Sequence, residues 1–160
     1  MDKQICFKSI GIIHSPYTEI SGVPIQPLNA IGIKGTIELN TVFTDGLKDI
    51  EGFSHIILVY VFHLTSKFSL QVIPFIDNKM HGIFATRSPS RPNAIGISTV
   101  RLINVDHNIL HIEDDDIIDG TPLLDIKPFY PQFDNRTTDK IGWLAGKENI
   151  YGIKSDDRFK

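Results

Sequence analysis

The sequence predicts a single all-β domain, barrel-like or sandwich-like, from its composition, its turn spacing and its lack of helical periodicity. The 160 residues include 26 isoleucines and 10 threonines but only 4 alanines and 11 leucines, so β-branched side chains outnumber those that favour helices. Turn-forming residues recur between short apolar runs, and no segment keeps a 3.6-residue apolar spacing. Neither a repeat nor a linker divides the chain, whose length suits one domain.

The first five elements alternate between extended runs and loops. Residues 5–13 have strand length, whereas residues 17–28 contain two prolines and a Ser-Gly pair and predict an irregular loop. Residues 31–39 alternate and predict a strand. Residues 45–50 predict one or two helical turns. Residues 55–62 are apolar at nearly every position, which predicts a central strand buried on both faces.

The middle of the chain predicts an edge strand, a short strand and one long strand. Residues 70–76 are interrupted by Pro74, which places them at an edge. Residues 82–86 predict a short strand that runs into a proline-rich turn. In residues 94–105 the apolar positions change phase, which predicts a bulge near Leu102.

The last elements are a hairpin, a strand and a polar appendage. Residues 109–112 follow the turn Asp106-His107-Asn108 and predict the second strand of a hairpin. Residues 123–129 predict the last strand, and residues 141–145 a short terminal helix. The chain from about residue 134 onward is a polar appendage to the domain.

Charge and cysteine content exclude several classes of protein. A net charge of −3, from 16 basic and 19 acidic residues, excludes a histone-like nucleic-acid coat. The longest apolar run, residues 56–62, is too short to span a bilayer, and the first nine residues do not resemble a secretion signal. The single Cys6 forms no internal disulfide. We therefore expect a cytoplasmic protein with no membrane partner.

The most unusual loop carries two arginines braced by prolines. Arg87 and Arg91 lie four residues apart, and prolines at positions 89 and 92 restrict the backbone. Two guanidinium groups on a stiff loop suit a carboxylate or phosphate ligand. The alternative is a solvated turn with surface ion pairs.

Two further loops carry weaker signals. The turn Asp119-Gly120-Thr121-Pro122 offers a carboxylate, a hydroxyl and backbone amides that suit a ribose diol or an ammonium group, although four residues alone favour an ordinary turn. Residues 23–27 form a proline-stiffened apolar loop with one amide. The usual glycine-rich and phosphate-loop nucleotide signatures are absent from the sequence, which disfavours a doubly wound fold.

No metal site is predicted. His55 and His63 are eight residues apart on one strand, which separates them by roughly 26 Å. The acidic run 113–116, with Asp119, has the oxygen ligands that Mg²⁺ or Ca²⁺ prefers, but such a run is more typical of a solvated surface.

Residues 82–96, which contain both arginines, resemble the signature of the TsaA-like family, also called TrmO. Other segments resemble the same family in the same order, over about residues 8–134: residues 10–17, 24–27, 47–63 and 119–128.

The resemblance implies a tRNA methyltransferase that uses S-adenosylmethionine. The family's reaction methylates N6 of threonylcarbamoyladenosine beside the anticodon, so the implied partner is a tRNA anticodon loop. The implied fold is a single small closed β-barrel with short helical turns, and members are usually homodimers. The barrel domain would span residues 1–133, with a C-terminal appendage at 134–160 packed on it or trailing from it.

Matching the family's motifs residue by residue implies a set of cofactor contacts. Arg91 and Asn93 are hypothesised to hold the carboxylate or carbonyl of the modified base. No side chain stands out as the proton acceptor, and Asp119 and His63 are the candidates. The implied cofactor contacts are Ile25, Gln26, Pro27, His63, Leu64, Arg87, Ile97, Asp119, Gly120, Thr121 and Pro122.

Two departures from the family pattern support a second class of function. Bacterial members often carry Gln at the position of Leu64, and they often continue beyond the position of Lys160. The alternative is a non-catalytic barrel that binds S-adenosylmethionine or RNA. A third class is a metal-dependent phosphoesterase that uses the acidic run.

Overall fold

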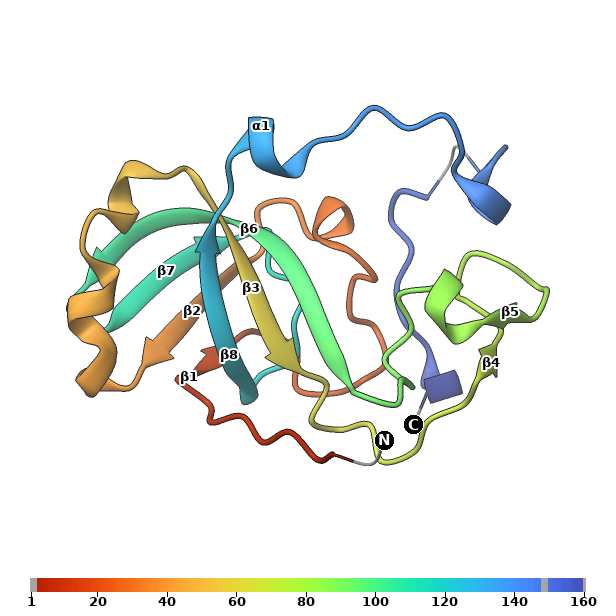
Figure 1. Ribbon diagram of the computed structural model, residues 1–160, viewed down its shortest axis with the longest axis horizontal. Coiled ribbons are helices and arrows are strands. Elements are labelled where there is room, and N and C mark those ends of the chain that lie inside the picture. Colours follow the sequence, from red (N-terminus) through yellow and green to blue (C-terminus); the bar gives the residue numbers. More distant parts are fainter. Residues whose placement is uncertain (1–2, 148–149, 160) are drawn as a thin grey trace.

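Six antiparallel strands close into a barrel in the order β1-β2-β7-β6-β3-β8 (Figure 1). The structure is a computed structural model that describes residues 3–147 and 150–159. Because β1 pairs with both β2 and β8, the all-β sheet closes as a barrel and not as a sandwich. The barrel strands are β1 (Gly11–His14), β2 (Lys34–Leu39), β3 (His55–Val61), β6 (Ile95–Asp106), β7 (Ile109–Glu113) and β8 (Thr121–Pro128).

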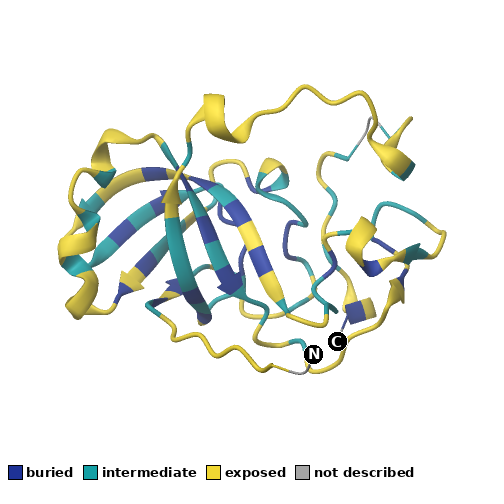
Figure 2. Cartoon of the chain, viewed as in Figure 1, coloured by how far each residue is buried: buried dark blue, intermediate teal, exposed yellow. Residues whose placement is uncertain are grey.

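Strand β3 is buried on one face only, so the prediction of burial on both faces is wrong. Ile56, Leu58 and Tyr60 belong to the core, while the residues between them are half-buried. Buried and half-buried positions alternate along this strand in Figure 2. A barrel wall has one inner face, and the apolar outer face of β3 is covered only in part by neighbouring side chains. The core comprises Ile13, Ile37, Leu39, Ile56, Leu58, Tyr60, Val100, Leu102, Leu110, Ile112, Ile117 and Leu123.

The long strand β6 contains the predicted bulge. Its pairing with β7 shifts register between Leu102 and Asn104, and Ile103 is exposed. The hairpin turn follows, with His107 in the left-handed region at φ 53°. The bulge lets this 12-residue strand bend around the barrel.

A second unit lies beside the barrel and has its own small apolar cluster. Strands β4 (Gln71–Val72) and β5 (His81–Gly82) form a two-stranded sheet. Val72 and Ile83 pack there with Phe159 from the end of the chain. The predicted strand at 82–86 is wrong beyond Gly82, because Ile83–Ala85 forms a 3₁₀ turn whose carbonyl at Ile83 accepts the Thr86 amide and hydroxyl.

The remaining regular structure is helical and short. The predicted turns near 45–50 and 141–145 are confirmed as 3₁₀ helices, whereas the first predicted strand begins only at Gly11. Among the described residues, no helix is long and apolar enough to cross a membrane. The helices are α1 (Pro131–Asp134), η1 (Pro27–Asn29), η2 (Thr41–Leu47), η3 (Ile50–Gly52), η4 (Ile83–Ala85), η5 (Gly142–Leu144) and η6 (Asp157–Phe159).

The C-terminal segment returns between the barrel and the β4–β5 unit (Figure 1). Lys154 forms an isolated antiparallel bridge with Pro24. The Ser155 amide donates to the carbonyl of Val23 at 2.8 Å, and its hydroxyl accepts the Val23 amide at 2.9 Å. These contacts attach residues 150–159 to the loop that follows β1.

Candidate functional site

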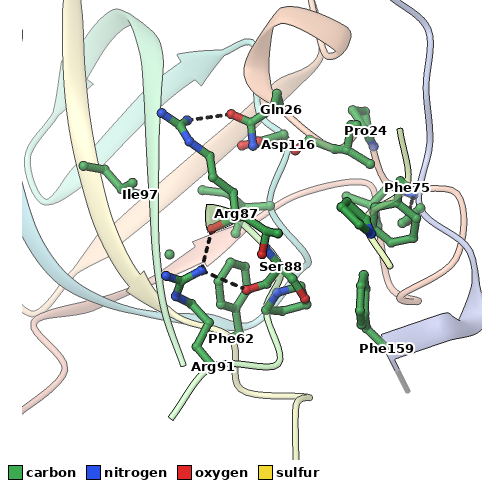
Figure 3. A pocket seen from close by; sticks show the side chains of 18 of the residues that line it. Pro24, Gln26, Phe62, Phe75, Arg87, Ser88, Arg91, Ile97, Asp116 and Phe159 are labelled. Atoms are coloured by element: carbon green, nitrogen blue, oxygen red, sulfur yellow. Dashed lines mark hydrogen bonds between the residues drawn. The ribbon is translucent and has the colours of Figure 1, made fainter. Parts of the chain in front are cut away.

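A cavity of about 890 Å³ opens at one mouth of the barrel. Its inner wall comes from the end of β3, the start of β6 and the start of β8, and its outer wall from the β4–β5 unit and the C-terminal segment (Figure 3). The loops 20–28 and 84–91 cover the rest. The lining is mostly apolar with a few polar groups, as is usual for small-molecule sites.

Arg87 and Gln26 meet in this cavity although 61 residues separate them. The Arg87 Nη1 donates to the Gln26 Oε1 at 2.7 Å (Figure 3). The Gln26 amide nitrogen donates to the carbonyl of Ile25 at 2.7 Å. The hydrogen bonds fix the amide orientation and aim the guanidinium along the cavity wall.

The Arg91 guanidinium donates hydrogen bonds to backbone carbonyls in and next to the proline-rich loop that carries it. Its Nη1 donates to the carbonyl of Thr86 at 2.8 Å, and to those of Ile83 and Ser88 at 3.3 and 3.4 Å. The loop is therefore braced by hydrogen bonds as well as by prolines. Arg91 also lines the cavity, whereas Asn93 is exposed and its carbonyl accepts the Ile95 amide at 2.8 Å.

Thr121 connects the start of β8 to the end of β3. Its hydroxyl donates to the carbonyl of Ile118 at 2.6 Å and lies 3.2 Å from the His63 Nδ1. A hydroxyl has one proton, so the Nδ1–H of His63 must donate to Thr121. This tautomer leaves the Nε2 of a neutral His63 as an acceptor.

The acidic run is not a solvated surface, so that expectation is wrong. The side chains of the run point apart: Asp114 accepts the Gly32 amide, Asp115 is fully buried, and Asp116 lines the cavity. Ile117, which follows the run, is packed in the core, so the end of the run lies close to the interior of the barrel. Within residues 3–147 and 150–159, no three His, Cys, Asp or Glu side chains are grouped so that they could hold a metal ion.

Asp115 is buried against β2. Its Oδ1 accepts the Ile117 amide at 3.0 Å, and its Oδ2 has no hydrogen-bond partner among the described residues. Burial raises the pKa of Asp115 to about 7, and the charges of Asp116 and Asp119 act in the same direction, against the Ile117 bond. A Cβ at Gly35 would lie 2.1 Å from the Oδ2, so glycine is required there.

Asp116 ends a buried chain of hydrogen bonds. Ser98 Oγ donates to the Asp116 Oδ1 at 2.6 Å, and the Tyr60 hydroxyl lies 3.1 Å from the same Oγ. Burial raises the pKa of Asp116 to about 7, although the Ser98 bond and the Arg87 charge act in the opposite direction. Burial, followed by the Asp116 charge, also raises the pKa of Tyr60. The sequence does not predict the group formed by Tyr60, Ser98 and Asp116. The one feature that indicates burial of Asp116 is the apolar pair of residues 117–118 that follows it.

The cavity gathers most of the residues that the sequence singled out. Asp119, Gly120 and Pro122 are not among its described lining residues. Asp119 instead accepts the Ser15 amide at 3.2 Å and lies 3.2 Å from the His14 Nδ1, so it fixes the end of β1 to the turn. The predicted residues that do line the cavity are Ile25, Gln26, Pro27, His63, Leu64, Arg87, Arg91, Ile97 and Thr121.

Comparisons with known proteins show the family of this chain and its fold. Residues 12–135 match the family described as the tRNA-methyltransferase O N-terminal domain. A probable S-adenosyl-L-methionine-binding protein of Pyrococcus abyssi is 53% identical, with 97% of this chain and 85% of that protein covered. The tRNA (adenine(37)-N6)-methyltransferase of Escherichia coli is 39% identical, over 78% of this chain. The crystal structure of TrmO from Pseudomonas aeruginosa matches 88% of this chain with a TM-score of 0.74 and 36% identity.

The chain is shorter than some of these relatives. The match covers 57% of the Escherichia coli protein and 63% of the Pseudomonas aeruginosa chain. Those two proteins therefore contain further regions that have no counterpart in the match.

Proposed function

Because this chain belongs to the family of tRNA-methyltransferase O N-terminal domains, we propose that it transfers a methyl group from S-adenosylmethionine to N6 of an adenine in tRNA. The finer proposal is that the acceptor is N6 of threonylcarbamoyladenosine, next to the anticodon. We further propose a cytoplasmic homodimer with a barrel domain at 1–133 and an appendage at 134–160.

The observation that carries the proposal is the convergence of three segments on one cavity. Arg87, Gln26 and Thr121 lie far apart in the sequence and line the same space. The volume of about 890 Å³ is in the range of small-molecule sites. A cavity assembled from loops at a barrel mouth needs no glycine-rich nucleotide turn.

The chemistry of the lining fits the cofactor. Ile97, Leu64 and Phe62 offer apolar surface for a purine, and Arg87 offers a cation for a carboxylate. When bound, the cofactor supplies an electrophilic methyl group. The residues proposed to hold it are Ile25, Gln26, Pro27, His63, Leu64, Arg87, Ile97 and Thr121, while Asp119, Gly120 and Pro122 are proposed to hold the turn that carries Thr121.

The protein's main contribution is to align the methyl donor with the acceptor nitrogen. Arg91 and Asn93 are proposed to position the modified base, Arg91 partly through the loop that it braces. Arg101 of β6 and Lys127 of β8 are exposed beside the first half of β3, whereas the cavity lies at its end, and Lys127 forms an ion pair with Asp125 at 2.7 Å. Arg101 is proposed to offer positive charge to a tRNA backbone on a protein of negative net charge.

The test is methyl transfer from labelled S-adenosylmethionine to two tRNA pools, one carrying the threonylcarbamoyl group and one lacking it. Label in the first pool only supports the proposal. Label in both pools would support methyl transfer to tRNA but contradict the proposed requirement for a threonylcarbamoyl group. Tight cofactor binding with label in neither pool contradicts the proposal and favours a non-catalytic binding module.

A further inference from the structure

The wall of the cavity contains a carboxylate that is held by two neighbouring strands. Tyr60 of β3 and Ser98 of β6 are buried, and their hydroxyls form a chain that ends at the Oδ1 of Asp116. Asp116 lies in the loop before β8 and faces the same space as Arg87 and Gln26 (Figure 3). Strands fix side chains more exactly than loops do, so the Asp116 carboxylate is held in place from the rigid part of the fold.

The direction of these hydrogen bonds leaves Asp116 as the acceptor. An ionised carboxylate cannot donate, so Ser98 donates its one proton to the Oδ1. Ser98 Oγ must then accept from the Tyr60 hydroxyl. The Ser98 hydrogen bond stabilises the ionised form of Asp116 and engages only the Oδ1.

From this geometry we propose that Asp116 is the proton acceptor of the methyl transfer, with Ser98 and Tyr60 as its positioning residues. The inference rests on the proposed function and extends it to a residue outside the predicted set. Asp119 points instead toward Ser15 and His14, away from this role. The His63 Nδ1 is engaged by Thr121, and its Nε2 remains an acceptor in the same cavity, but His63 is not held by the two buried strand hydroxyls that position Asp116.

The chemistry of the acceptor nitrogen requires such a group. N6 of threonylcarbamoyladenosine lies between the adenine ring and a carbonyl, so its lone pair is delocalised and weakly nucleophilic. In the proposed step, N6 forms a bond to the methyl carbon of S-adenosylmethionine. The bond between that carbon and sulfur breaks, and the electron pair of the broken bond stays on sulfur. The N6 proton passes to a carboxylate oxygen of Asp116. A sulfonium cation and a carboxylate anion become a neutral thioether and a neutral acid, so charge balances without a further reactant.

The electrostatic surroundings suit a base that works near neutral pH. The side chains that act on Asp116 are Ser98 from β6 and Arg87 from the proline-rich loop, and Asp116 in turn acts on its neighbour Asp115 and on Tyr60 from β3. Burial holds the pKa of Asp116 at about 7 against the Arg87 charge and the Ser98 bond. A base with a pKa near the working pH combines an adequate ionised fraction with useful basicity.

The principal test is Asp116→Asn, with single-turnover methyl transfer measured from pH 5.5 to 8.5 and cofactor affinity measured by calorimetry. We expect affinity within about threefold of wild type and a rate reduced by about 100-fold or more. The rise of the wild-type rate through pH 7 should disappear. Asp106→Asn, at the far end of β6, is the matched control and should keep both the rate and the profile. Circular dichroism checks that each variant folds.

Ser98→Ala tests the positioning role separately. Without the Ser98 hydrogen bond the pKa of Asp116 should rise, so the ascending limb of the rate profile should move to higher pH. The inference would be overturned if the Asp116→Asn variant kept the wild-type methyl-transfer rate and its pH dependence. It would also be overturned if the variant lost activity only because it bound the cofactor more weakly. A wild-type protein that methylates neither tRNA pool would overturn the proposed function itself, and that failure is visible before any variant is made.

Discussion

Gly96 of β6 lies directly against the ring of Tyr60, its register partner on β3. A Cβ at position 96 would lie 2.3 Å from Tyr60 Cε2 and 2.5 Å from Cζ. The missing side chain therefore creates the space in which the Tyr60 hydroxyl reaches Ser98. The packing of the barrel wall and the geometry of the cavity depend on the same glycine.

Gly96→Ala should lower both stability and activity. The added methyl group overpacks a tight site, which costs about 1–3 kcal/mol of the free energy of unfolding. Displacement of the Tyr60 ring should also weaken the hydrogen bond from its hydroxyl to Ser98, which positions Asp116, and should thereby reduce methyl transfer. Urea denaturation and a methyl-transfer assay measure the two effects. Gly46→Ala, where no atom of a described residue lies within 4 Å of the new Cβ, is the control. Equal stability of the two variants would contradict this prediction.

Arg91→Ala should loosen the proline-rich loop. The variant loses the hydrogen bonds from Nη1 to three backbone carbonyls, of which the 2.8 Å bond to Thr86 is the shortest. We expect weaker cofactor binding, faster proteolysis within residues 86–93 and a stability loss of about 1–2 kcal/mol. Arg136→Ala removes an exposed guanidinium that, among the residues the structure describes, donates a hydrogen bond to the adjacent carbonyl of Asn135, and it should change none of these quantities. Unchanged proteolysis in Arg91→Ala would exclude the bracing role.

Asp115→Asn should reduce the dependence of stability on pH. Because the folded pKa is about 7 and the ordinary value is 3.8, the folded chain holds more protons than the unfolded chain between about pH 4 and 7. Unfolding therefore releases protons, and stability falls as the pH rises through this window, by an amount on the order of 2–4 kcal/mol. Urea denaturation at pH 5, 6, 7 and 8 should show a shallower fall in the variant. Parallel curves for the two proteins would disprove the assignment.

Trp143 should report cofactor binding by its fluorescence. It is the only tryptophan in the chain, it lines the cavity, and its Nε1 donates to the carbonyl of Ala85 at 2.7 Å. Its ring stacks on His81 with centroids 4.3 Å apart. Titration with S-adenosylmethionine should change the emission with the dissociation constant that calorimetry gives. Trp143→Phe should keep the stacking but lose the hydrogen bond, and should bind the cofactor more weakly. Emission that stays constant through saturation would place the cofactor away from this wall.

The sequence predicts most of the barrel because the strand signals are local. The phase change near Leu102 indicates the bulge in β6, and the prolines around Arg87 indicate a stiff loop. These features depend on neighbours within a few residues. The outer face of β3 differs from the prediction because apolar content alone does not distinguish a barrel wall from a strand covered on both sides.

The candidate site was only partly predictable because its decisive contacts are distant in sequence. Asp116 lies in a run of four acidic residues, and its position in the cavity wall follows from Ser98, 18 residues away, and from Tyr60 beyond it. The contact between Trp143 and Ala85 spans 58 residues. No pattern of charge or hydrophobicity within a short window encodes such pairings.

The attachment of Lys154 and Ser155 to the loop at 22–24 separates the barrel from the wall of its cavity along the chain. All six barrel strands end by residue 128, whereas the segment that completes the outer wall lies more than twenty residues further on. A chain truncated ahead of residue 150 would therefore keep every barrel strand and leave the cavity open on one side.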